Sequence, residues 1–215
     1  MGDTQEKGTR RIEQRAAKRS SLMLRAAKLL AESGEYVCIV RDVSATGAKL
    51  RLFHAPPPDL HLFLELADGE RHAMERVWHR EDHAGFRFSC EIDVGRFIRE
   101  SGEFPRRPLR LNLQHPALVG VGAETCDATL ADLSQHGACV DAAARLAIGQ
   151  PVRLEVPGLP VRDGRVRWRR GGRHGLVFQQ AFRLDELAGH ALSLQPFGRD
   201  AADDVLAVPG VARCA

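Results

Sequence analysis

The strongest constraint on the fold of this chain is an internal repeat of about 90 residues. The segment Asp42-Val-Ser-Ala-Thr-Gly47 recurs 90 residues further on as Asp132-Leu-Ser-Gln-His-Gly137. Three other residues recur at the same offset: Trp78, Gly85 and Phe88 are repeated as Trp168, Gly175 and Phe178. A chain of 215 residues that is built from two such copies favours two small domains over one large domain. We therefore expect a tandem duplication.

Within each copy, apolar and polar residues alternate, which is the pattern of a half-buried strand. The alternation is clearest over residues 48–52 and 152–156. Further strands are expected at Tyr36–Arg41, His61–Leu66, His72–His79, Ala84–Phe88, Ala138–Ala142, Arg162–Arg169 and Leu176–Gln180. The expected turns between strands are Ser33-Gly34, Asp68-Gly69, Asp163-Gly164 and Gly171-Gly172. Short strands at this spacing predict small antiparallel barrels, because closure leaves no exposed strand edge.

Each barrel is expected to carry one short flanking helix, so the fold class is mainly all-β. Asp93 is the expected N-cap of a helix over Val94–Glu100, and Asp185 is the expected N-cap of a helix over Glu186–Leu194. The expected division is a flexible N-terminus (1–9), a first domain (10–100), a linker (101–105), a second domain (106–195) and a loosely ordered C-terminal tail (196–215).

The basic residues of the chain are nearly all arginine. Of 31 basic residues only four are lysines. Arginine presents a planar fork of donors that suits phosphate groups and the O6/N7 edge of guanine. The bias therefore favours an anionic or guanine-bearing partner, although a GC-rich genome would also favour arginine codons.

Several classes of protein are not expected from this sequence. The five cysteines form no C-x-x-C pair and no Cys/His cluster with zinc spacing, so neither a metal site nor a cofactor is expected. No apolar stretch approaches the roughly 18 residues that span a bilayer, and no secretory leader is visible, so we expect a cytoplasmic protein without membrane insertion. No nucleophile elbow, P-loop or pair of catalytic carboxylates is present, so no catalytic residue and no enzyme activity are expected.

Two residue patterns carry the hypothesis of a binding site. Asp-x-Ser-x-x-Gly should arise roughly 0.05 times by chance at this composition, yet it occurs at equivalent places in both copies. Arg-x-x-x-Arg should arise roughly three times by chance, but it precedes the aspartate pattern in both copies, at Arg15/Arg19 and at Arg106/Arg110. The aspartate can accept hydrogen bonds from N1–H and N2–H₂ of guanine, and the arginines can grip phosphate oxygens. The competing interpretation is that aspartate and serine only satisfy backbone groups of a turn.

These paired patterns resemble the two signature motifs of the PilZ domain. The resemblance rests on Arg15-Ala-Ala-Lys-Arg19 with the motif at Asp42, and on Arg106-Arg-Pro-Leu-Arg110 with the motif at Asp132. It implies a six-stranded antiparallel barrel in each copy and a cyclic di-GMP site on the outer surface of the barrel. It also implies the site residues: Arg15, Arg19, Arg106 and Arg110 for phosphate and guanine edges, Asp42, Ser44, Asp132 and Ser134 for guanine, and Gly47 and Gly137 for ligand clearance.

The resemblance also implies a function, that of a bacterial cyclic di-GMP receptor. Such a receptor changes conformation on binding and regulates a process such as motility, biofilm formation or exopolysaccharide production, through a protein partner that we expect here. Gln14 and Pro105 stand where the family often carries a further arginine, which favours one ligand molecule per site. The basic segment Lys7–Arg19 is expected to become ordered when the ligand binds.

Two other functions are compatible with the same barrels. One is a nucleotide-independent protein–protein adaptor of the PilZ type. The other is a nucleic-acid-binding barrel, which the small number of exposed aromatics and the many interspersed acids disfavour. Trp78 and Trp168 are expected to pack the barrels rather than to act as stacking surfaces.

Overall fold

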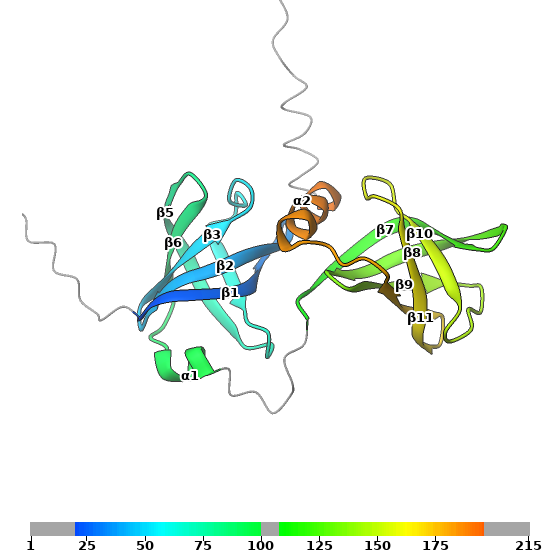
Figure 1. Ribbon diagram of the computed structural model, residues 1–215. Coiled ribbons are helices and arrows are strands. Elements are labelled where there is room, and N and C mark those ends of the chain that lie inside the picture. The colour runs from blue at the N-terminus through cyan, green and yellow to red at the C-terminus, as the bar shows by residue number, and fades with distance from the viewer. Residues whose placement is uncertain (1–19, 100–107, 196–215) are drawn as a thin grey trace, which may run out of the picture.

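The computed structural model describes residues 20–99 and 108–195, which form two closed antiparallel barrels of six strands each (Figure 1). Barrel 1 has the strand order β1-β2-β3-β6-β5-β4 and closes through the β1–β4 pair. Its elements are β1 (Ser20–Ala31), β2 (Gly34–Ser44), β3 (Gly47–Leu52), β4 (His61–Glu65), β5 (Arg71–Arg80), β6 (His83–Phe88) and the helix α1 (Val94–Arg99).

Barrel 2 repeats this topology. Its strand order is β10-β11-β12-β9-β8-β7, and it closes through the β7–β10 pair. Its elements are β7 (Arg110–Val121), β8 (Glu124–Ser134), β9 (Gly137–Ala142), β10 (Pro151–Glu155), β11 (Arg162–Arg170), β12 (Arg173–Phe178) and the helix α2 (Leu184–Leu194). The prediction of two tandem six-stranded barrels with short flanking helices is confirmed.

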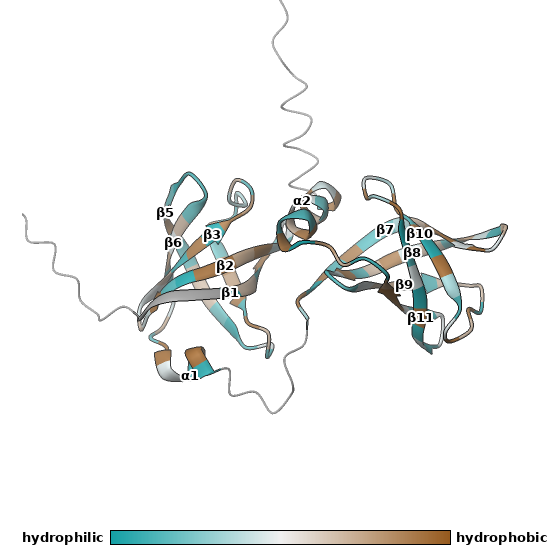
Figure 2. Cartoon of the chain, viewed as in Figure 1, coloured by the Kyte–Doolittle hydropathy of each residue, from teal (hydrophilic) through white to brown (hydrophobic). Residues whose placement is uncertain are grey.

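The alternation seen in the sequence places one face of each strand inside a barrel. In β3, Ala48, Leu50 and Leu52 are buried, whereas Lys49 and Arg51 on the opposite face are partly exposed. Apolar and polar residues are correspondingly interleaved along the strands (Figure 2). Burial of each large aliphatic side chain contributes about 2 kcal/mol, so the two interiors are the main source of stability.

Two local predictions are wrong. Asp163 and Gly164 do not form a turn but lie within β11, where a Cβ on Gly164 would meet the carbonyl oxygen of Val177 at 2.5 Å. The glycine therefore allows close approach of β12 rather than a change of chain direction. The second helix begins at Leu184, and its N-cap is Arg183 rather than Asp185.

The helix caps nevertheless follow expected chemistry. The backbone N–H of Arg183 donates to the Glu186 carboxylate at 2.8 Å, half of a capping box. In barrel 1 the predicted cap is confirmed, since the carboxylate of Asp93 accepts the backbone N–H of Arg96 at 3.0 Å.

The helix α2 follows barrel 2 in the chain but packs between the two barrels (Figure 1). Its buried face contributes to the core of barrel 2, and Val37 of β2 joins the same cluster. Leu192 faces the core of barrel 1 instead. Next to this helix, Gly34 has a φ of 143°, and any side chain there would collide with Gln195. The two barrels therefore meet through a shared apolar contact.

The flexible N-terminus, the linker at 101–105 and the C-terminal tail that we expected lie outside the described residues. Within the two described ranges, no helix is long and apolar enough to span a bilayer. The same residues contain no group of three or more His, Cys, Asp or Glu side chains that could hold a metal ion.

Candidate functional site

The two motif aspartates lie on the outer face of the barrels, beside equivalent β-bulges. The pairing of β2 with β3 shifts register between Val40 and Asp42, and the pairing of β8 with β9 shifts between Leu130 and Asp132. A bulge inserts one unpaired residue and re-aims the side chains that follow it. Both aspartates are consequently partly exposed at the surface of a barrel.

The motif serines close the turns that follow the aspartates. The hydroxyl of Ser44 donates to the carbonyl oxygen of Gly47 at 3.2 Å, and that of Ser134 donates to Gly137 at 2.9 Å. Both serines are buried, with 9% and 3% of their surface exposed. The donor of each hydroxyl is thus used within the turn, as the turn interpretation predicts, and a contact of Ser44 or Ser134 with a ligand stays a prediction.

The motif glycines are needed because of the neighbouring strand. Neither Gly47 nor Gly137 has a positive φ. A Cβ on Gly47 would collide with the carbonyl oxygen of Phe86, and one on Gly137 would collide with that of Leu176. Since a main-chain carbonyl within a barrel cannot swing aside, these two positions exclude any side chain, and clearance of a ligand by the same glycines stays a prediction.

A row of four residues crosses the outer face of barrel 1 from the motif. Asp42 of β2 pairs with Lys49 of β3, Lys49 pairs with Gly85 of β6, and Gly85 pairs with Trp78 of β5. We call these residues the outer row of barrel 1. The outer row of barrel 2 has the same register and consists of Asp132, Cys139, Gly175 and Trp168.

The tryptophans of the outer rows do not pack inside the barrels, so the expectation for Trp78 and Trp168 is wrong. A bulge in β5 and another in β11 turn each indole to the outside, where it lies over Gly85 or Gly175. The two tryptophans are 40% and 38% exposed. An exposed indole beside a carboxylate is a surface on which a purine base can stack. The repeat itself contains the signal for these residues, because tryptophan and glycine recur at the offset of the motifs.

A cavity of about 250 Å³ lies over the outer row of barrel 1. It is lined by the whole row together with residues of the β2–β3 turn and Arg87. The Oδ1 atom of Asp42 is buried and has no hydrogen-bond partner among the described residues. An unsatisfied buried carboxylate oxygen costs free energy, so this cavity offers an acceptor to a ligand that carries N–H donors.

Two cations flank this cavity. Lys49 makes no ion pair with any residue of the described ranges, and its side chain lies next to Asp42 across the strand pair. Arg87 pairs with Glu75 at 3.2 Å, but both side chains are largely exposed, so solvent screens the interaction. The site of barrel 1 therefore combines a carboxylate, an indole and two cations.

In the part of the chain that the structure describes, barrel 2 has its cation on a different element. Arg110, at the start of β7, donates to Oδ1 of Asp132 at 2.9 Å. Cys139 and Val177 occupy the places that Lys49 and Arg87 have in barrel 1. Burial raises the pKa of the Cys139 thiol, and the charge of Asp132 raises this pKa further, so the thiol is neutral at pH 7.

The structure thus brings part of each predicted set together. Asp42, Ser44 and Gly47 lie at one site, and Arg110, Asp132, Ser134 and Gly137 lie at the other. Arg15, Arg19 and Arg106 lie outside the described residues. A ligand contact for any of the ten residues stays a prediction.

Comparison with known proteins gives one family and several solved structures. The family model of the PilZ domain matches twice, over residues 13–100 and 103–190. Similar structures include the PlzA protein of Borreliella burgdorferi in complex with c-di-GMP, with 12% identity, 77% of this chain and 86% of that chain covered, and a TM-score of 0.32. YcgR of Escherichia coli in complex with c-di-GMP has 15% identity, coverage of 85% and 88%, and a TM-score of 0.32.

A third similar structure is the PilZ domain of CeSA from a cellulose synthesizing bacterium. It has 22% identity, covers 43% of this chain and 98% of that chain, and has a TM-score of 0.31. Comparison with curated proteins gives no match. The family match therefore rests on the family model, which includes most of both copies of the repeat.

Proposed function

The chain belongs to the PilZ domain family, with one domain in each barrel, and from this premise we propose that it is a receptor for cyclic di-GMP. Each molecule of the dinucleotide binds at one outer row. The receptor then acts on a protein partner, and catalysis is no part of its role.

The observation that carries the proposal is the unpartnered carboxylate oxygen of Asp42 in the cavity of barrel 1. Guanine presents two adjacent donors, N1–H and N2–H₂, which one carboxylate can accept together. Trp78 supplies a flat apolar surface beside that carboxylate, and Lys49 supplies a positive charge. A guanine nucleotide with phosphate groups matches all three features of the cavity.

The proposed roles of the residues follow from their chemistry. Asp42 and Asp132 bind the guanine edge, and the indoles of Trp78 and Trp168 stack on a base. The remaining predicted residues complete the two sites: Arg15, Arg19, Arg106 and Arg110 bind phosphates and guanine, Ser44 and Ser134 hold the turns beside the base, and Gly47 and Gly137 leave room for it. One ligand molecule occupies each site.

The proposed output is a change of conformation that a downstream protein detects. Arginine donors bind phosphate oxygens strongly, so a bound dinucleotide would draw the arginine-bearing segments onto the barrels. The regulated process is of the kind that the family controls, such as motility, biofilm formation or exopolysaccharide production.

Calorimetric titration tests the proposal. Wild type, Asp42→Ala and Asp132→Ala are titrated with cyclic di-GMP, with GTP as the control ligand. We expect affinity near the micromolar range, about −8 kcal/mol, and the loss of one site in each variant. Asp127→Ala is the matched control, because Asp127 is an exposed residue of the same strand as Asp132 and lies outside the outer row.

An absence of heat with cyclic di-GMP would contradict the proposal. The nucleotide-independent adaptor would then be the better description of the same barrels. Heat that is unchanged in both aspartate variants would contradict the proposed location of the sites but not the binding itself.

A further inference from the structure

A buried lysine of barrel 1 lies at the contact between the two barrels. Lys28 of β1 is only 6% exposed. Its ammonium group lies 2.9 Å from Oε2 of Glu35 and 2.9 Å from Oε1 of Glu65, and it donates to the carbonyl oxygen of Arg110 at 3.1 Å. An ammonium group has three N–H donors, so every donor of Lys28 has a partner. The third partner is the main chain of barrel 2.

Glu35 provides a second connection to the same strand of barrel 2. Its carboxylate accepts the backbone N–H of Asn112 at 2.8 Å and the Nδ2 group of Asn112 at 2.7 Å. In the β7–β8 pair, Asn112 lies opposite Asp132, and Arg110 lies opposite Ser134. Barrel 1 therefore holds β7 at two places, both directly across from the motif of barrel 2.

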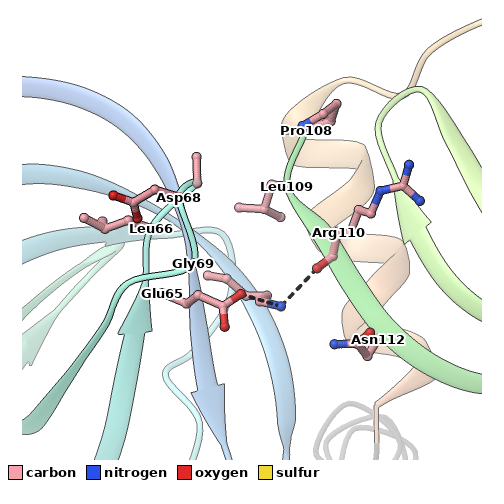
Figure 3. A pocket seen from close by; sticks show the side chains of 10 residues that line it. Glu65, Leu66, Asp68, Gly69, Pro108, Leu109, Arg110 and Asn112 are labelled. Atoms are coloured by element: carbon pink, nitrogen blue, oxygen red, sulfur yellow. Dashed lines mark hydrogen bonds and ion pairs between the residues drawn. The ribbon is translucent and has the colours of Figure 1, made fainter. Parts of the chain in front are cut away.

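The side chain of Arg110 points away from this contact. Lys28 and Arg110 both line a cavity of about 460 Å³. Figure 3 shows the carbonyl oxygen of Arg110 directed toward barrel 1, where a dashed line joins it to the ammonium nitrogen of Lys28, and its guanidinium directed to the other side. On that side the guanidinium binds Asp132 at 2.9 Å. The main-chain atoms of Arg110 and its charged group thus serve two different contacts.

We propose that Lys28 and Glu35 are positioning residues for the ligand site of barrel 2, an inference that rests on the proposed function. They hold the main chain of β7 so that the guanidinium of Arg110 stands beside Asp132, where a phosphate or a guanine edge is bound. A buried ion pair contributes little net stability, but it fixes the geometry of the groups around it when all its hydrogen bonds are made.

Among the described residues, the contacts of Lys28 and Glu35 support the site of barrel 2 and have no equivalent at the site of barrel 1. At the place of Lys28, barrel 2 carries Leu118, which is 40% exposed and lies opposite Glu155 in the β7–β10 pair. The cavity beside Lys28 and the cavity over the outer row of barrel 1 share no lining residue among those described. The substitution of Glu35 should therefore affect the two ligand sites differently.

The first test measures cyclic di-GMP affinity at each site separately. Glu35→Gln is combined with Asp42→Ala, which leaves the site of barrel 2, and with Asp132→Ala, which leaves the site of barrel 1. We expect the dissociation constant of the barrel 2 site to rise about tenfold, a usual coupling for contacting residues, and that of the barrel 1 site to stay unchanged. Equal effects on both sites, or none, would overturn the inference.

Glu32→Gln is the matched control, because Glu32 is an exposed carboxylate near the same hairpin that makes no hydrogen bond to barrel 2 in the described part of the chain. Its substitution should change neither dissociation constant. Lys28→Met is the second variant, and the same asymmetry between the two sites is expected. Melting temperatures of all variants show whether they fold.

A second test needs no nucleotide. The ¹⁵N chemical shifts of the Arg110 guanidinium are measured by NMR, with Asp132→Ala as the reference for the unpaired side chain. In Glu35→Gln these shifts should move toward the reference, and unchanged shifts would overturn the inference. If wild type binds no cyclic di-GMP, the proposed function fails, whereas this measurement still decides whether Glu35 positions Arg110.

Discussion

The two barrels carry the same outer row with one substitution in the middle. Aspartate, glycine and tryptophan occupy equivalent places in both rows, but Lys49 of barrel 1 is replaced by Cys139 in barrel 2. The retained residues are those on which the shape depends, since any side chain in place of Gly85 or Gly175 would collide with the indole. The exchanged residue differs in exposure, since Lys49 is partly exposed and Cys139 is buried.

Among the described residues, the cations of the two sites consequently come from different elements. Barrel 1 has Lys49 and Arg87 on β3 and β6, whereas barrel 2 has Arg110 at the start of β7. Arg110 is also the residue through which barrel 1 contacts β7. The described residues of the two sites thus share the shape of the outer row and differ in the source of positive charge, and the arginine of the barrel 2 site is the one whose main chain contacts the other barrel.

The largest effect is expected on stability, from substitution of a motif glycine that both barrels carry. Gly137→Ala should lower the stability of barrel 2 by about 3 kcal/mol, because the new methyl group would collide with the carbonyl oxygen of Leu176. Urea unfolding is followed by tryptophan fluorescence in a Trp78→Phe background, so that Trp168 is the reporter. Gly189→Ala is the control, since a Cβ there meets no atom within 4 Å. Equal stability of the two variants would contradict this account of the glycine.

The next largest effect is expected on ligand affinity, from substitution of the tryptophan that both outer rows carry. Trp78→Ala and Trp168→Ala should each weaken cyclic di-GMP binding at their own site by about 2 kcal/mol, the size of a base–aromatic stacking contact. Calorimetry in the Asp132→Ala and Asp42→Ala backgrounds isolates each site, and substitution by Phe should retain most of the affinity. A loss in only one barrel would mean that the two indoles have different roles.

A smaller effect on affinity is expected when Lys49 and Cys139, the residues that differ between the two outer rows, are exchanged. Cys139→Lys should strengthen binding at barrel 2 by about 1 kcal/mol, and Lys49→Cys should weaken binding at barrel 1 by a similar amount, because one phosphate contact is added or removed. The affinity of the lysine-bearing sites should also fall more steeply with salt. Dissociation constants measured at two salt concentrations check the change in affinity and its salt dependence. Identical salt dependence of the lysine-bearing and cysteine-bearing sites would refute both predictions.

The smallest effect is expected in the pH dependence of stability, from Glu65 at the contact between the barrels. Burial raises the pKa of Glu65, but hydrogen bonds from Lys28 and Arg71 outweigh burial and hold this pKa below its ordinary value of 4.5. Since the carboxylate is favoured in the folded state, its contribution to stability is present above pH 4.5 and is lost as the pH falls through the lowered value.

Glu65→Gln should accordingly be less stable than wild type near pH 7, and the difference should shrink in acid. Melting temperatures over this pH range measure the difference. Glu155→Gln at the equivalent place of barrel 2 is the control, because Glu155 is half exposed and its ion pair with Arg153 is long, at 3.9 Å. A difference that is constant with pH would contradict the assigned role of Glu65.

Much of the fold could be predicted from local patterns. The repeat at Asp42 and Asp132 and the alternation of apolar residues gave the two antiparallel barrels, because strand periodicity is written in neighbouring residues. The errors occurred where a local signal has two meanings. Gly164 resembles a turn residue but permits close strand packing, and Trp168 follows a bulge that reverses the expected face.

The sequence by itself determined that the chain forms two barrels and that each motif lies at a turn between two strands. Only the tertiary structure decided which residues share a site, since Asp42, Gly85 and Trp78 meet through the register of four strands. It also decided that Lys28 contacts Arg110, 82 positions away. The physical reason is that periodicity and turn chemistry act between near neighbours in the chain, whereas register and the contact between barrels depend on the whole packed molecule.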